Sequence, residues 1–255
     1  MNETPIADLQ DLILVAGHAP FKKETEAVPD HPEKDDGWFL QPFQRGEPPF
    51  YIEHIRRGVI LLANNPAALL VFSGGHTRPE AGLRWSEAST YLEIAKHFKW
   101  WVPDEFASLR QTVDVHTTVE SYARDSFENV LFGVCRFQQV VKRYPRNVTV
   151  VSWAFKRARF DFHRAAIRFP SGRFHFDGFN DPLIPQWQNE ANALHDFIES
   201  RYGSDGKLGE KRAGRNPFNQ QHDYRSCPGL AAFFDFIERP ENRQKEFPGR
   251  LPWED

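Results

Sequence analysis

The chain has 255 residues, of which 40% are hydrophobic and 14% aromatic. This supplies a sizeable core, so we predict a folded globular protein and exclude a disordered one. The formal net charge of -3 at pH 7 gives no overall attraction to nucleic acid or to an anionic membrane. Only two cysteines are present, so disulfides do not hold the fold together and a metal site built on cysteines is not expected.

Neither a transmembrane segment nor a targeting signal is predicted. The early apolar run at 12–16 is far shorter than the roughly 20 apolar residues of a spanning helix. The N-terminus lacks the basic start and the longer apolar stretch of a signal peptide. We therefore expect a cytoplasmic protein whose partners include neither nucleic acid nor a membrane; its oligomeric state stays open.

The first predicted element is a strand at 12–16, where an apolar run ends at Gly17 and Pro20. The charged, proline-rich segment 21–49 has no helical or strand periodicity, and we expect it to be a long loop that closes over a binding site. The remaining apolar spacing predicts, in order, helix 52–62, strand 68–72, helix 88–98, strand 112–118, helix 127–141, strand 148–153, helix 155–169, strand 173–179 and helix 187–198.

This alternation of strands and helices is typical of a parallel sheet with helices on both faces. The strand at 112–118 is predicted because alternation places Val113 and Val115 on one face. Residues 1–202 are expected to form one α/β domain that carries the 21–49 loop as an insertion. From residue 203 the composition shifts to Gly, Pro, Arg and Asn, so we expect 203–255 to be a C-terminal extension packed on the same domain.

Polar segments follow several of the predicted strands. Ligands of open parallel sheets bind beyond the carboxyl ends of the strands, so these segments are expected to converge on one site. The candidate ligand-binding residues are Gly17, His18, Ser73, Gly74, Gly75, His76, Arg78, Ser126, Asn129, Ser152, Lys156, Arg159 and His163.

The glycine pair after the strand at 68–72 raises two possibilities. Gly74 and Gly75 can present backbone N–H groups to an anion, and the helix start that follows adds partial positive charge. In that case Arg78, Lys156 and Arg159 would neutralise the anion. The alternative is a tight turn that leaves the strand and binds nothing. The stretch is neither a Walker loop nor a G-x-G-x-x-G fingerprint.

Three carboxylates, Glu87, Glu120 and Asp125, are the acid/base candidates of this site. Helix capping is an alternative explanation for Glu87, next to Ser86, and for Asp125, which resembles the N-cap of a capping box. Asparagine is unfavourable inside a helix, so Asn129 is expected to point into the site or towards the glycine pair.

The histidines and cysteines do not predict a metal or a hydrolase centre. None of the ten histidines falls in a metal-ligand motif, although His18 and His76 both follow strands and could meet in space. A metal site is not expected. No G-x-S-x-G elbow is present, and Cys135 lies on the apolar side of a helix, where a core role is expected.

Four stretches resemble, in order, a domain-of-unknown-function family that includes the bacterial SanA, ElyC and YdcF proteins: LLVFSGGHTR, RWSEAS, ESYARDSFENVLF and VTVVSWAFKRARFDFHRAA. The longer motif forms are similar to its eukaryotic, fungal-type branch. The resemblance implies a Rossmann-like three-layer α/β/α sandwich with a mainly parallel sheet. It also implies S-adenosylmethionine or a nucleotide as a ligand to consider, because one member is reported to bind S-adenosylmethionine.

Residue by residue, the resemblance carries the family's glycine turn onto Gly74 and Gly75. The family's last motif usually has a histidine shortly after the serine that matches Ser152, and this chain has Phe155 and Lys156 there instead. His163 comes later and is either a substitute for that histidine or unrelated to it. No general reaction follows from the family.

Our first hypothesis is a cytosolic protein that binds a small molecule and acts on it as an enzyme. The ligand is expected to be anionic, nucleotide-like or adenosyl-containing. The reaction is expected to be phosphoryl or other group transfer, or hydrolysis. The alternative is a non-catalytic interaction protein on an enzyme-like scaffold. In that case the aromatic, proline-rich segments 38–50 and 218–253 would form an exposed apolar patch.

Overall fold

The computed structural model describes residues 4–182 and 186–254, so the first three residues, part of the stretch read for a signal peptide, lie outside it. One sheet holds five parallel strands in the order β3-β2-β1-β4-β5. The prediction of a Rossmann-like three-layer fold is confirmed. The strands are β1 (Asp11–Ala16), β2 (Ala68–Ser73), β3 (Thr117–Glu120), β4 (Asn147–Ser152) and β5 (Phe174–Gly178).

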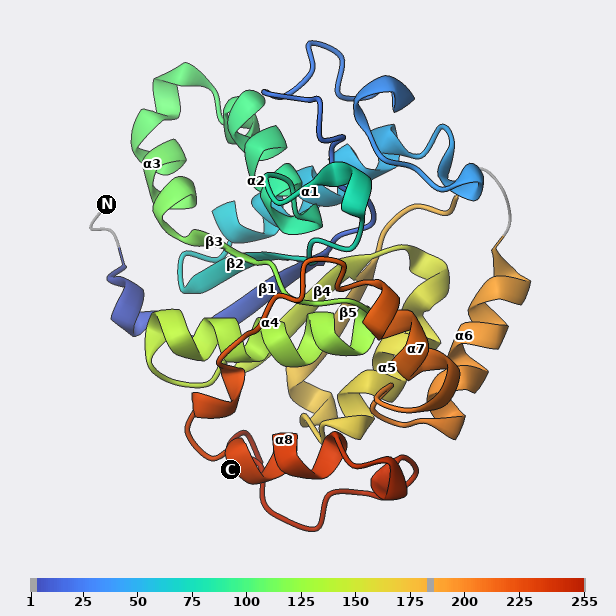
Figure 1. Ribbon diagram of the computed structural model, residues 1–255. Coiled ribbons are helices and arrows are strands. Elements are labelled where there is room, and N and C mark those ends of the chain that lie inside the picture. Colours follow the sequence, from blue (N-terminus) through green and yellow to red (C-terminus); the bar gives the residue numbers. More distant parts are fainter. Residues whose placement is uncertain (1–3, 183–185, 255) are drawn as a thin grey trace.

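Helices cover both faces of the sheet (Figure 1). One face carries α1 (Pro48–Ala63), α2 (Glu87–His97) and α3 (Ala107–Val115), and the other carries α4 (Ser126–Val141), α5 (Arg157–Ala166) and α6 (Trp187–Glu199). Side chains of β1 alternate between the two layers: Val15 packs with α1 and α2, whereas Leu14 packs with α4. Both faces are buried, which explains the continuous apolar runs of the strands.

The strand order places a topological switch point between β1 and β4. The chain adds β2 and β3 on one side of β1, then crosses through α4 to the other side for β4 and β5. The helices therefore diverge from the crevice beyond these two central strands, which is where open α/β sheets bind ligands. Gly17 and Trp153 directly follow the two strands at this point.

The predicted strand at 112–118 is wrong in most of its length. Residues up to Val115 belong to α3, and β3 begins at Thr117. Val113 is 1% exposed, whereas Val115 is 45% exposed, so the two side chains do not share a face. Val113 and Leu109 pack on the same core instead, and their spacing of four residues suits a helix.

The segment 203–255 adds α7 (Gly206–Gly214) and α8 (Ala231–Ile237) and crosses the α4 side of the sheet (Figure 1). Apolar side chains of this segment join the core cluster of α4 and α5, and Trp253 donates a hydrogen bond through Nε1 to the carbonyl oxygen of Ile167 at 2.8 Å. Cys135 is buried in this core, as predicted, and the thiol of Cys227 lies 3.8 Å from its carbonyl oxygen.

The 21–49 segment is largely irregular but is anchored at its centre. Trp38 is 1% exposed and donates a hydrogen bond through Nε1 to the carbonyl oxygen of Pro32 at 2.7 Å. Trp38 also pairs with Phe21 in an isolated antiparallel bridge. Phe43, in contrast to the buried Trp38 and Phe21, has a side chain that is 49% exposed. Across 4–182 and 186–254, no helix combines the length and the apolar character needed to cross a membrane.

Candidate functional site

A cavity of about 550 Å³ lies beyond the carboxyl ends of β1 and β4, at the switch point; we call it the strand-end cavity. The structure brings ten of the predicted site residues to its walls: Gly17, His18, Arg78, Glu87, Asp125, Ser126, Asn129, Ser152, Lys156 and Arg159. The remaining candidates lie behind or away from the walls: Ser73, Gly74, Gly75, His76, Glu120 and His163. The 21–49 segment contributes Phe43, Gln44 and Glu47.

The glycine turn after β2 has no free donors to offer. The backbone N–H of Gly74 donates to the carbonyl oxygen of Glu120 at 2.9 Å, and that of Gly75 donates to the carbonyl oxygen of Ala123 at 2.7 Å. The carbonyl oxygens of both glycines accept hydrogen bonds from the first backbone N–H groups of α2. The prediction that this pair cradles an anion is therefore wrong, and the turn joins β2, α2 and the loop after β3.

Glu87 is the acid/base candidate that the structure leaves available. The predicted cap of α2 is confirmed, because Ser86 Oγ accepts a hydrogen bond from the Ser89 N–H at 2.9 Å. Glu87, at the first helical position, lines the cavity, and its Oε1 accepts from Thr77 Oγ at 2.7 Å. No hydrogen bond to Glu87 Oε2 is found within the described residues. Burial raises the pKa of Glu87, so the carboxyl group holds a proton more readily than an exposed one.

Glu120 is enclosed by donors and has no access to the cavity. Its carboxylate accepts hydrogen bonds from Ser73 Oγ at 2.7 Å, the Tyr122 N–H at 2.7 Å and the Tyr224 hydroxyl at 3.2 Å. Burial raises the pKa of Glu120 to about 7. Asn129 extends this network to the cavity wall by donating through Nδ2 to Ser73 Oγ at 2.9 Å. Glu120 thus fixes the loop after β3.

Both carboxylate oxygens of Asp125 are hydrogen-bonded within the protein. It is the N-cap of α4, as predicted, and its Oδ1 accepts from the Glu128 N–H at 3.0 Å. Its Oδ2 accepts from Arg212 Nε at 2.5 Å. Burial opposes ionisation, yet the Arg212 guanidinium holds the pKa of Asp125 below its ordinary value. The predicted capping box is half formed, because the Glu128 carboxylate binds Arg124 instead of returning to the N-cap.

Cationic side chains without a carboxylate partner converge on the strand-end cavity. Within the part of the chain that the structure describes, they are Arg78, Lys156, Lys211 and Arg215. Burial, reinforced by the neighbouring Arg159, lowers the pKa of Lys156 to about 7. Arg159 itself is not available to a ligand, because it donates to both oxygens of Glu190 at 3.0 and 2.6 Å.

Two of these cations come from the C-terminal extension and were not among the predicted site residues. Lys207, Lys211 and Arg215 recur every four residues along and just after α7, so they share one face, and that face lines the cavity. Lys207 is paired with Asp196 at 2.9 Å. The spacing was visible in the sequence, but a cationic stripe on a short helix is usually a solvated surface.

Two neutral polar groups at the cavity have no partner in the described residues: Nε2 of His18 and Oγ of Ser152, both buried. The His18 ring stacks on Trp153 with the centroids 5.8 Å apart. Burial and, to a smaller extent, the charge of Lys156 lower the pKa of His18 well below its ordinary value. His18 is therefore neutral at physiological pH, and each group can exchange a hydrogen bond with a ligand.

His163 reaches the site through Ser126. Its ring is fully buried, and Nε2 lies 2.8 Å from Ser126 Oγ on the cavity wall. Nδ1 is buried and has no partner within the described residues. An unpaired buried N–H costs more than an unpaired lone pair, so we assign the proton to Nε2. Ser126 then accepts from His163 and can donate its own proton into the cavity.

His18 and His76 do not meet. His76 Nε2 lies 2.9 Å from the carbonyl oxygen of Leu83, and His76 lines a separate cavity. In residues 4–182 and 186–254, no group of three or more His, Cys, Asp or Glu side chains is arranged to hold a metal ion.

Comparison with known proteins finds similarity to one of unassigned role. The uncharacterized protein YOR238W of Saccharomyces cerevisiae is 27% identical over 299 residues, covering 95% of this chain and 97% of the yeast protein. The similarity therefore spans both the sheet and the C-terminal extension, and it agrees with the fungal character of the motifs. No family model and no solved structure matches the chain, so the relation to the SanA, ElyC and YdcF proteins stays a prediction.

Proposed function

We propose that the protein binds a small anionic ligand in the strand-end cavity and acts on it as an enzyme of group transfer or hydrolysis. Nucleotide-like and adenosyl-containing molecules are the ligands to consider first. The observation that carries the proposal is the convergence of Arg78, Lys156, Lys211 and Arg215 on one cavity without carboxylate partners.

The charge balance of the cavity favours an anion. Of the carboxylates at its walls, Asp125 and Glu190 are ion-paired with arginines, and Asp196 is paired with Lys207. Glu47 accepts a hydrogen bond from the Tyr51 hydroxyl at 2.6 Å, and burial raises its pKa. Loss of water around the Lys156 ammonium and the neighbouring charge of Arg159 disfavour the charged form, which is why the pKa of Lys156 is low. A bound phosphate or carboxylate would relieve that cost.

The neutral groups suit the recognition and the chemistry of such a ligand. Ser126 lies at the first position of α4, a 16-residue helix whose N-terminal end carries partial positive charge. Ser152 Oγ and His18 Nε2 add two polar groups that have no partner in the described residues. Glu87, with one oxygen free of hydrogen bonds and a raised pKa, is the side chain we assign to proton transfer.

The rival role as an interaction protein gains little support from the fold. It called for an exposed apolar patch, but the aromatic side chains of the two segments in question are mostly turned inward. Trp38, Phe233, Phe247 and Trp253 are each less than 10% exposed, at 1%, 0%, 8% and 2%. Cytoplasmic localisation remains a prediction.

A thermal-shift panel on purified protein tests the proposal. The panel contains inorganic phosphate, nucleotides, sugar phosphates and S-adenosylmethionine, each with and without divalent metal. A ligand at about 100 times its dissociation constant stabilises the fold by about 2.7 kcal/mol, which is a measurable rise in melting temperature. We expect at least one anion to give this rise.

A pair of lysine variants locates the binding. Lys156→Met removes a cation from the cavity, and Lys34→Met removes the same charge from an exposed loop. The rise should disappear in the first variant and persist in the second. A panel that stays flat at saturating concentrations, or an equal loss in both variants, would refute anion binding in this cavity.

A further inference from the structure

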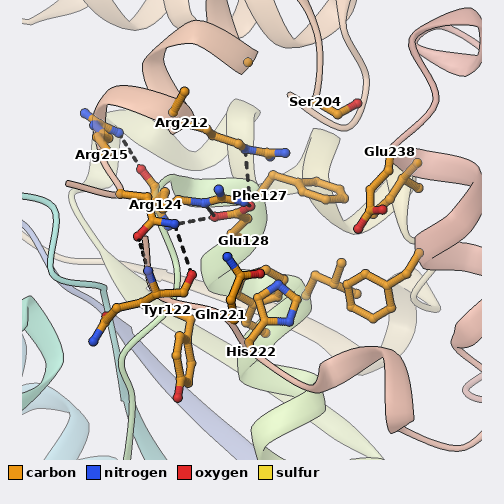
Figure 2. Close-up of a pocket in the computed structure, with 18 of the residues that line it drawn as sticks. Tyr122, Arg124, Phe127, Glu128, Ser204, Arg212, Arg215, Gln221, His222 and Glu238 are labelled. Atoms are coloured by element: carbon orange, nitrogen blue, oxygen red, sulfur yellow. Dashed lines mark hydrogen bonds and ion pairs between the residues drawn. The ribbon is translucent and has the colours of Figure 1, made fainter. Parts of the chain in front are cut away.

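A second cavity, of about 360 Å³, adjoins the strand-end cavity; we call it the extension cavity. It lies between the start of α4 and the segment 204–238, so the C-terminal extension forms much of its wall. Figure 2 shows Arg124, Glu128 and Arg212 linked on one side of it and His222 on another. Arg124 and Arg215 line both cavities, so the two spaces share a wall.

Aromatic rings line much of the extension cavity. The His222 ring lies 4.4 Å from the Phe132 ring and 5.8 Å from the Phe234 ring, and it stacks on Tyr224 at 25°. Burial lowers the pKa of His222, which keeps this ring neutral. Rings arranged in this way offer both faces and edges to a further ring. Stacked and edge-to-face contacts stabilise an aromatic ring more than contact with an aliphatic surface of the same area does.

Among the arginines that line the extension cavity, Arg124 and Arg212 are paired with carboxylates of the protein, and Arg215 at the shared wall is not. Arg124 and Arg212 both bind the Glu128 carboxylate, and Arg212 also binds Asp125. Arg215 donates to the carbonyl oxygen of Arg124 at 2.7 Å and has no carboxylate partner within the described residues. Because Arg215 lines both cavities, a head group bound to it would lie beside the extension cavity, within reach of an arm that enters that cavity.

We propose that the extension cavity binds the aromatic ring of an organic anion whose head group lies in the strand-end cavity. The substrate class is thus an anion with a planar aromatic arm. This rests on the proposed function, since it assumes that the strand-end cavity holds the head group. Ser204, whose Oγ is buried without a partner in the described residues, offers a polar contact to the ring edge.

Sulfonates of constant charge test this assignment. Methanesulfonate, cyclohexanesulfonate, benzenesulfonate and 2-phenylethanesulfonate are fully ionised at neutral pH, so only the arm differs. Their affinities for the full chain are measured by NMR titration. We expect one of the two aromatic sulfonates to bind about tenfold tighter than methanesulfonate, because burial of one ring is worth at least that factor. Cyclohexanesulfonate should bind less tightly than that aromatic compound.

Two tryptophan variants localise the arm. Ala213→Trp fills the extension cavity from an exposed position on α7, whereas Gly214→Trp adds the same side chain next to it, in open space and off both cavities. The aromatic gain should vanish in the first variant and survive in the second, with methanesulfonate affinity unchanged in both.

Equal affinities for all four sulfonates, or an aromatic gain that survives Ala213→Trp, would overturn the extension cavity as the ring site while leaving anion binding intact. If neither the sulfonates nor any anion of the thermal-shift panel binds, or if binding is insensitive to Lys156→Met, the proposed function fails first, and this inference falls with it.

Discussion

The exits of β2 and β4 look alike as sequence, but the structure treats them differently. After β2, the backbone N–H groups of Gly74 and Gly75 and the carboxylate of Glu120 are all consumed by hydrogen bonds within the protein. After β4, Ser152 Oγ has no partner in the described residues and Lys156 has no carboxylate partner there. The first exit is a structural joint, and the second is open to a ligand.

The two exits show that polar residues at a strand end can be consumed by the fold itself, so the donors and charges that remain unsatisfied are the ones to consider for a ligand. A buried polar group without a partner is costly, so a fold that retains one has some compensation elsewhere. The following predictions test whether the glycine turn after β2 is structural and whether Lys156 after β4 binds the proposed anion.

Gly75→Val should have the largest effect, and it should act on folding. A Cβ atom at Gly75 would lie 2.8 Å from the carbonyl oxygen of Ala123, and backbone cannot easily give way. We expect the free energy of unfolding to fall by about 3 kcal/mol, as for overpacking in a buried site. Urea denaturation followed by circular dichroism measures it.

Gly172→Val is the matched control, because no atom lies within 4 Å of a Cβ built there. It should change the unfolding free energy by less than about 0.5 kcal/mol. If both variants are equally stable, the β2 exit is not the joint that its hydrogen bonds indicate.

Glu120→Gln should cost about 2 kcal/mol, because the new amide N–H₂ group faces hydrogen-bond donors. The variant should also remove a pH dependence. Folding raises the pKa of Glu120 from 4.5 to about 7, so the folded state binds the extra proton between these values. This group's stabilisation is present below pH 4.5 and is lost as the pH rises through 7. The other titrating groups are common to both proteins, so the unfolding free energy of the wild type minus that of the variant should fall as the pH rises from 4.5 to 7.5.

At the β4 exit, Lys156 should make the affinity of the strand-end cavity for an anion depend on pH. Its pKa of about 7 means that the ammonium is present below that pH and lost above it. Sulfate, which does not titrate here, should bind with constant affinity below pH 7 and up to about tenfold more weakly per pH unit above it.

Calorimetry of sulfate binding at pH 8, in two buffers of different ionisation enthalpy, should show proton uptake in the wild type, because binding favours the charged form of Lys156. Equal heats in both buffers for the wild type would remove Lys156 from the binding site.

The last prediction concerns which ring nitrogen of His163 carries the proton, and it is the smallest effect expected. Nitrogen-15 NMR should place the proton of His163 on Nε2, where it supports Ser126 as a donor to the cavity. His54 is an internal reference, since its Nε2 lies 2.8 Å from the carbonyl oxygen of Phe179 and must donate to it. Burial lowers the pKa of His54 to about 4, so it is neutral as well. A proton on Nδ1 of His163 would make Ser126 the donor to the histidine instead.

The sheet and most helices were predictable because they depend on local periodicity and capping. The caps at Ser86 and Asp125 follow from residue type and position alone. The same rules failed at α3, where Val113 and Val115 fit an alternating pattern only by chance over a short stretch.

The site was predictable in place but not in detail. The strand-end rule located the cavity from the order of elements. It could not foresee that the carbonyl oxygens of Glu120 and Ala123 would accept from the glycine N–H groups, because those contacts join residues 46 and 48 positions apart in the sequence. Nor could it show that Lys211 and Arg215 face the strand ends, since that depends on the path of the chain after residue 203.

The contribution of α7 has a consequence for biosynthesis. The sheet can assemble once β5 has been made, and domains form as units while the chain emerges from the ribosome. The strand-end cavity still lacks Lys211 and Arg215 at that stage, because both follow β5 in the chain. The four cations of the proposed anion site are therefore complete only after α7 and residue 215 have been made.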